Sequence, residues 1–244
     1  MNNDFFKFED NDLDFPLYNG KPNASLMGWL LLLAGFILHI AFSLGLWNYI
    51  PGVQYWAILT PIVPTLILLI PLAYCCGGNL GLIFQIPKLK DMKVVFICII
   101  AYFAFTLTVS MILRIFGIVG TPNPLGEVAV SAPGFVVILL VVSLVGEELF
   151  KLTSMLLVMA VVYRFTKDRK TSMIVGLSCC CVIFGLIHLS TYNYNVVQCL
   201  AMIGLGCAIH MFPYLKTKNL TNSYLTHLLM DLLIFVPVML MGTV

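Results

Sequence analysis

Charged residues are scarce in this sequence. Only 10% of its 244 residues are Asp, Glu, Lys or Arg, and 61% are hydrophobic, against roughly 25% and 45–50% in globular proteins. So few charges cannot cover the surface of a soluble domain of this size, and the mean hydropathy of +1.02 agrees. The composition therefore excludes a soluble domain, a nucleic-acid-binding protein and a secreted disulfide scaffold, and it indicates an integral membrane protein.

Several local signatures are also missing. The eight cysteines form no CxxC pair and lie mostly in apolar segments, where thiols behave as small hydrophobic groups. No HExxH helix occurs, so the usual metalloprotease motif is absent. The N-terminus lacks the basic start and short apolar stretch of a signal peptide. Residues 1–25 are polar and acidic instead, and we expect them to form a partly disordered tail.

Long apolar segments, in contrast, are abundant. A transmembrane helix needs about 20 mainly apolar residues, and the candidate spans are 26–47, 54–75, 94–116, 133–163, 172–190, 194–212 and 220–242. The fourth is long enough to be strongly tilted, broken or divided into two half-helices. We predict an all-α, polytopic membrane helical bundle of about seven transmembrane helices, in which residues 26–244 form a single transmembrane domain after the tail.

Basic residues are missing from alternate loops of this seven-helix arrangement. Eleven of the thirteen Lys and Arg residues lie in the tail and in the second, fourth and sixth loops. The positive-inside rule makes that side cytoplasmic, so we expect the N-terminus inside and the C-terminus outside. The expected location is a cell membrane, which the protein crosses several times. Compact size and a short acidic tail without an organelle signal favour a prokaryotic plasma membrane.

A few ionisable side chains lie inside the predicted spans. Each charge at the bilayer centre costs about 2.5–3.5 kcal/mol on insertion scales, so such groups must face one another or a water-filled cavity. Together with one phenylalanine at helical spacing, these residues are Glu147, Glu148 and Lys151 in the fourth span, Phe184 and His188 in the fifth, and His227 and Asp231 in the seventh. Intramembrane ionisable groups are candidate functional residues by default.

Helical spacing predicts which of these groups meet. Glu147 and Lys151 are four residues apart, so they share a helix face and are expected to neutralise each other. Glu148 is rotated by about 100° from Glu147 and is expected to point at a different neighbour. His227 and Asp231 share a face in the same way. Three helices therefore each present polar or aromatic groups one turn apart, and their convergence would form a small polar site.

Such a set of side chains can activate water. A buried carboxylate can act as a general base, a histidine can share its proton, and a second histidine can donate to an oxyanion. The same residue types are suited to hold zinc with an open position for water. A structural ion pair or the proton relay of a transporter is a further alternative. His39 and His210 have no acidic partner on their own helix, and we expect them to be packing residues or to bond a backbone carbonyl.

The three motifs resemble those of a known family. In chain order they are Glu147-Glu148, Phe184-x-x-x-His188 and His227-x-x-x-Asp231. They are similar to the three motifs of the CPBP family, also called the Abi family, which comprises CAAX-processing endoproteases and bacteriocin-processing or immunity proteins. The resemblance covers roughly residues 133–235. It implies an intramembrane endopeptidase that hydrolyses a peptide bond of a membrane-associated protein or peptide.

The resemblance also implies residue roles. Glu147 would activate the hydrolytic water together with His188, and Glu148 would orient neighbouring groups. His227 and Asp231 would stabilise the oxyanion or, in the older metalloprotease view of the family, ligate a metal such as zinc. In that case the candidate metal ligands are Glu148, His188, His227 and Asp231. The implied partners are membrane lipids and the substrate, and no nucleic acid.

Two residues depart from the family pattern. The first motif usually reads Glu-Glu-x-x-x-Arg, but here Leu152 occupies the arginine position and the cation is Lys151, one residue earlier. Lysine cannot form the bidentate contacts of an arginine. Asp231 stands where many members have asparagine, which adds a negative charge. These departures favour the alternative of a catalytically inactive membrane scaffold, or an immunity or regulatory protein, that keeps the family fold.

Overall fold

The structure is a computed structural model that describes residues 5–10, 13–50 and 59–242. Within these residues all regular elements are helical, as predicted. They are α1 (Leu26–Ser43), η1 (Leu46–Tyr49), α2 (Leu59–Cys75), η3 (Leu80–Leu82), η4 (Leu89–Asp91), α3 (Met92–Ile115), α4 (Leu125–Ser131), α5 (Pro133–Thr166), α6 (Arg169–Ile187), α7 (Val196–Gln198), η5 (Cys199–Gly204), α8 (Leu205–Thr217) and α9 (Leu220–Met241).

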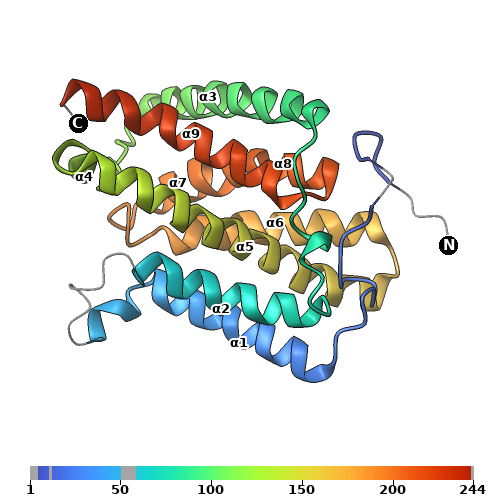
Figure 1. Cartoon of the computed structure of the whole chain (residues 1–244). Helices are drawn as coiled ribbons and strands as arrows, with labels where there is room; N and C mark the ends of the chain where they lie inside the picture. Colours follow the sequence, from blue (N-terminus) through green and yellow to red (C-terminus); the bar gives the residue numbers. More distant parts are fainter. Residues whose placement is uncertain (1–4, 11–12, 51–58, 243–244) are drawn as a thin grey trace.

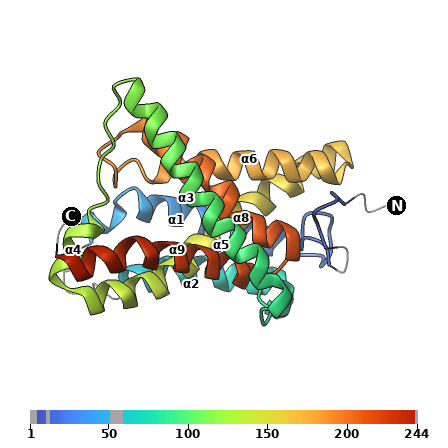
Figure 2. The same cartoon turned by 90° about the horizontal axis from the view of Figure 1, so that it is seen from above.

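Helix α5 is the central element of the bundle (Figure 1). It packs against α1, α2, α4, α6 and α9, and α3 packs against α8 and α9 on the far side of that group. Figures 1 and 2 show the N-terminal residues at one end of the bundle, with the starts of α1, α3, α6 and α9. The C-terminus and α4 lie at the opposite end. Most side chains proposed for the site come from helices that touch α5.

All seven predicted spans contain a helix, although positions 54–58 of the second span lie outside the described residues. Five helical segments are long and apolar enough to cross a membrane: Leu26–Ser43, Leu89–Ile115, Arg169–Ile187, Val196–Thr217 and Leu220–Met241. Helix α2 is shorter, at 17 residues, and α5 carries Glu147, Glu148 and Lys151 in its interior. The all-helical fold is thus confirmed, and the five apolar helices indicate a multi-pass membrane protein.

The fourth and sixth predicted spans have unexpected forms. The fourth is one unbroken helix, α5, of 34 residues, which corresponds to a length of about 51 Å at 1.5 Å per residue. The sixth is a composite of α7, the π-helix η5 and α8. Gly185 of α6 lies against this π-helix, and a Cβ atom there would lie 2.6 Å from the carbonyl oxygen of Cys199. Only glycine allows α6 and η5 to approach so closely.

The described part of the acidic tail is packed, which contradicts the expected disorder for those residues. Glu9 is 6% exposed and accepts hydrogen bonds from two guanidinium nitrogens of Arg169, at 2.9 and 2.6 Å, and from Lys218 Nζ at 2.6 Å. Asp14 accepts a bond from Arg169 Nε at 2.9 Å. The ring of Phe15 lies against both cations. The tail is ordered because its carboxylates pair with cations from α6 and from the turn before α9.

The tail contacts predict a pH-dependent stability. Burial alone raises the pKa of Glu9. The hydrogen bonds from Arg169 and Lys218 outweigh this effect and lower the pKa to about 2. Glu9→Gln removes the carboxylate that the two buried cations share and leaves Lys218 without one, although Arg169 keeps Asp14, so we expect a loss of about 3–5 kcal/mol in unfolding free energy at neutral pH. The Glu9 contribution is complete above the unfolded pKa of 4.5. It is lost as the pH falls toward 2, because the depressed pKa belongs to the folded state.

Unfolding of detergent-solubilised protein between pH 7 and pH 2 measures this difference. The control is Asp10→Asn, because Asp10 pairs with Lys216 at 3.1 Å in a partly exposed position, where an ion pair contributes about 1 kcal/mol or less. Equal losses in the two variants, or a Glu9→Gln effect that does not change with pH, would contradict the assignment.

The close approach of α6 to η5 predicts a sensitive glycine. Gly185→Ala places its Cβ against two backbone atoms, the Cys199 carbonyl oxygen and, at 3.2 Å, Gly204 Cα, so we expect about 1–3 kcal/mol of destabilisation. Gly134→Ala on α5 is the matched control, because nothing lies within 4 Å of a Cβ there and alanine favours a helix. Thermal unfolding measures the stability of both variants relative to wild type. A Gly185→Ala protein as stable as wild type would show that α6 and η5 can move apart at no energetic cost.

Candidate active site

A cavity of about 290 Å³ lies inside the bundle between α3, α5, α6, α8, α9 and the segment that precedes α4. Its ionisable lining residues are Glu147, His188, His210, His227 and Asp231, and Tyr102, Asn123, Phe184 and Tyr192 also line it. Residues from all three predicted motifs therefore contribute to one cavity.

The cavity explains how residues at different positions along their helices meet. His188 follows the last residue of α6, whereas His227 lies near the start of α9. The cavity extends along α9 and so reaches both histidines. On α9 it is lined, at intervals of three or four residues, by His227, Asp231, Phe235 and Val238. This line of residues leads toward the end of the bundle that carries α4 and the C-terminus (Figure 1).

Behind the cavity wall lies a buried ion pair between Glu148 and Lys151, with side chains 1% and 0% exposed. His227 Nδ1 lies 2.8 Å from the same oxygen of Glu148, and His227 Nε2 lies 4.0 Å from Asp231 Oδ2. The predicted pairing of Glu147 with Lys151 is therefore wrong. On a helix, a residue neighbours those both three and four positions away. Lys151 pairs with Glu148, three positions before it, because both side chains face α9.

Glu147 lines the cavity instead. Among the residues that the structure describes, no side chain or backbone group makes a hydrogen bond to its carboxylate. Glu148, in contrast, already receives Lys151 and His227 on one oxygen. The other oxygen of Glu148 is buried without a partner, and Glu148 does not line the cavity. Of the two adjacent glutamates, Glu147 is thus the one placed to accept a hydrogen bond from water or a ligand in the cavity.

Hydrogen bonds fix the ring states of two histidines. His188 Nδ1 lies 2.7 Å from the carbonyl oxygen of Phe184, which can only accept, so Nδ1 carries the proton. His227 Nδ1 lies 2.8 Å from the Glu148 carboxylate and 3.3 Å from Lys151 Nζ. The shorter contact is to an oxygen that can only accept, which assigns the proton to Nδ1 here too. In their neutral forms both rings therefore present an unprotonated Nε2. These nitrogens can accept a proton or a hydrogen bond.

His210 belongs to the same cavity, which the sequence did not predict. It is 4% exposed, and neither ring nitrogen has a hydrogen-bond partner. Its ring centroid lies 4.3 Å from that of His227 and 4.6 Å from that of Tyr102. His39, in contrast, lies 3.3 Å from the carbonyl oxygen of Pro64, as expected. His210 was missed because its neighbours come from α3 and α9 and not from its own helix.

The proposed metal ligands do not assemble into a metal site. In the described part of the chain, no three His, Cys, Asp or Glu side chains are grouped to hold a metal ion. Lys151 Nζ lies 3.3 Å from His227 Nδ1 and pairs with Glu148, so a cation already occupies the space between two candidate ligands. The arrangement does not fit zinc at Glu148, His188, His227 and Asp231.

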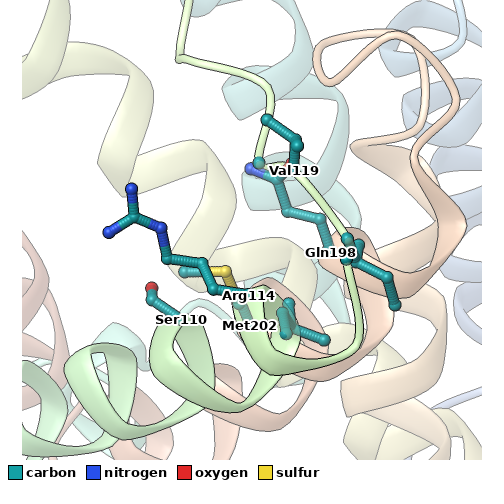
Figure 3. Close-up of a pocket in the computed structure, with 9 residues that line it drawn as sticks. Ser110, Arg114, Val119, Gln198 and Met202 are labelled. Carbon is teal, nitrogen blue, oxygen red and sulfur yellow. The ribbon is translucent and has the colours of Figure 1, made fainter.

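A second pocket, of about 490 Å³, lies at the end of α3. Figure 3 shows Ser110 and Arg114 on one side of it and Gln198 on the other. The side chain of Gln198 accepts a bond from the Thr121 amide at 2.7 Å and donates to the Thr121 carbonyl at 2.9 Å. This pair of bonds holds the segment between α3 and α4, which contributes residues to both pockets.

Comparison of the chain with protein-family models, with curated proteins and with solved structures found no match.

The buried ion pair predicts strong coupling between its partners. Glu148→Gln and Lys151→Met each leave one buried charge unpaired, so we expect each to lower the unfolding free energy by about 3–5 kcal/mol. The double variant leaves neither charge and should lose much less than the sum. Unfolding of the four proteins in detergent measures the coupling. Additive losses would show that the two side chains do not depend on each other.

Proposed function

We propose that the protein is an intramembrane endopeptidase of the CPBP type, which hydrolyses a peptide bond of a membrane-associated protein or peptide. The observation that carries this proposal is the shared cavity of Glu147, His188, His227 and Asp231. The three motifs supply these residues in the family's order. Substrates in this class include CAAX-type proteins, bacteriocin precursors and signalling peptides.

The proposal includes an orientation in the membrane. With α2 and α5 added to the five apolar segments, seven helices cross the bilayer, the N-terminus is cytoplasmic and the C-terminus is outside. The distribution of Lys and Arg supports this arrangement. The cavity then extends from the bundle interior toward the outer side, because it follows α9 from His227 to Val238. A prokaryotic plasma membrane is the favoured location.

In the proposed reaction, water is activated by Glu147 and His188. The water oxygen attacks the carbonyl carbon of the scissile bond, and its proton moves to Glu147 or to the unprotonated Nε2 of His188. The same proton then passes to the leaving amine as the C–N bond breaks. The buried Glu148–Lys151 pair holds His227 through its Nδ1 proton. His227 can therefore donate from Nε2 only in its doubly protonated form, which Asp231 at 4.0 Å would stabilise.

A catalytically inactive scaffold or immunity protein is the second candidate. It is supported by the position of the cation, because Lys151 pairs with Glu148 and Leu152 is completely buried where the family has arginine. Such a protein would use the ion pair only to stabilise the bundle.

Cleavage of a peptide and lipopeptide library by detergent-purified protein tests the proposal. We expect Glu147→Gln to lower kcat by about 10²–10⁴-fold, because a general base is removed, without a large change in thermal stability. The control is Glu127→Gln, since Glu127 is exposed on α4 and should retain wild-type activity. Equal cleavage by wild type and Glu147→Gln would contradict the endopeptidase assignment. Absence of cleavage, with a cellular phenotype that survives Glu147→Gln, would favour the scaffold.

A further inference from the structure

His210 is a buried polar group without a partner. A neutral imidazole always carries one N–H donor and one acceptor nitrogen, and burying such groups unpaired costs about 1–3 kcal/mol. Both nitrogens of His210 lack a hydrogen-bond partner, although the residue is only 4% exposed. Because His210 lines the cavity, whatever fills the cavity is the available partner for its ring.

The three cavity histidines differ in what they can offer a ligand. His188 and His227 each use the Nδ1 proton within the protein, for the Phe184 carbonyl and the Glu148 carboxylate. In their neutral forms they present only an acceptor to the cavity. His210 makes no such hydrogen bond, so in either tautomer its ring has an N–H that donates to no described protein group.

The ring of His210 is also held in place. The Ser223 hydroxyl donates a bond of 2.6 Å to the backbone carbonyl of His210 and so fixes this point of α8 against α9. The ring lies between the rings of Tyr102 and His227. A donor that is positioned before the reaction stabilises developing charge without a reorganisation cost.

We propose that His210 is a catalytic residue that donates its ring N–H to the carbonyl oxygen of the scissile peptide bond. This inference rests on the proposed endopeptidase function. When water adds to the carbonyl carbon, the C=O π electrons move to the oxygen, and the hydrogen bond from His210 stabilises the resulting oxyanion. No covalent bond to His210 forms. The negative charge develops in a cavity that already holds Glu147 and Asp231, so a donor at this position offsets unfavourable repulsion.

His210→Phe and His210→Gln separate this role from packing. We expect His210→Phe to lower kcat by about 10²–10³-fold, the usual effect of removing one oxyanion donor, with KM changed only a few-fold. Its thermal stability should be equal to or above that of wild type, because two unpaired polar atoms are removed. Glutamine keeps an N–H donor, so His210→Gln should retain at least about 10-fold more activity than the phenylalanine variant. His210→Leu replaces the phenylalanine variant if that protein does not fold.

His39→Phe is the matched control, because His39 is equally buried but stacks on Phe150 and bonds Pro64 outside the cavity. It should keep the wild-type kcat. Wild-type turnover in His210→Phe, with Glu147→Gln inactive, would overturn the inference and leave the endopeptidase assignment standing. Equal activity of the glutamine and phenylalanine variants would also overturn it. If the wild-type protein cleaves no peptide, the proposed function fails and the role of His210 fails with it.

Discussion

An ionisable side chain inside an apolar helical bundle must have a partner or contact water, and the centre of this structure follows from that constraint. Glu148 and Lys151 meet the requirement by pairing with each other, and His227 joins them through Glu148. Glu147 and Asp231 meet it differently, because they line a cavity. The ion pair therefore does more than neutralise two charges. It fixes one glutamate and one histidine, and it leaves the neighbouring glutamate free for chemistry.

The remainder of the fold places this centre. Helix α5 carries both glutamates and Lys151 and packs against five other helices, so its side chains face several neighbours at once. The π-helix η5 crosses α6 at Gly185, close to the end of α6 that carries His188. At the basic end of the bundle, Glu9 of the tail connects α6 to the turn before α9 through Arg169 and Lys218. These contacts hold the three motif helices in register.

The sequence predicted the helical fold and the motif residues of the cavity because both have local signals. Long apolar segments define the helices, and charges within them identify Glu147, Glu148, Lys151 and Asp231 without knowledge of the packing. The partners could not be predicted in the same way. Helical spacing allows Lys151 to reach either glutamate, and the neighbouring helix α9 decides the choice. His210 has its neighbours on other helices. The tail looked disordered because its cations lie more than 150 residues away along the chain.

In the proposed arrangement, the face of α9 that lines the cavity contacts water, which enters from the side opposite the basic loops. Ile234 and the adjacent Leu233 are both exposed, at 40% and 56%, but only Ile234 lines the cavity. In a cysteine-free background, we expect a membrane-impermeant maleimide added outside intact cells to label Ile234→Cys and not Leu233→Cys, since the thiolate forms only in contact with water. Equal labelling of the two positions, or labelling of Ile234→Cys only from the cytoplasmic side, would contradict the account.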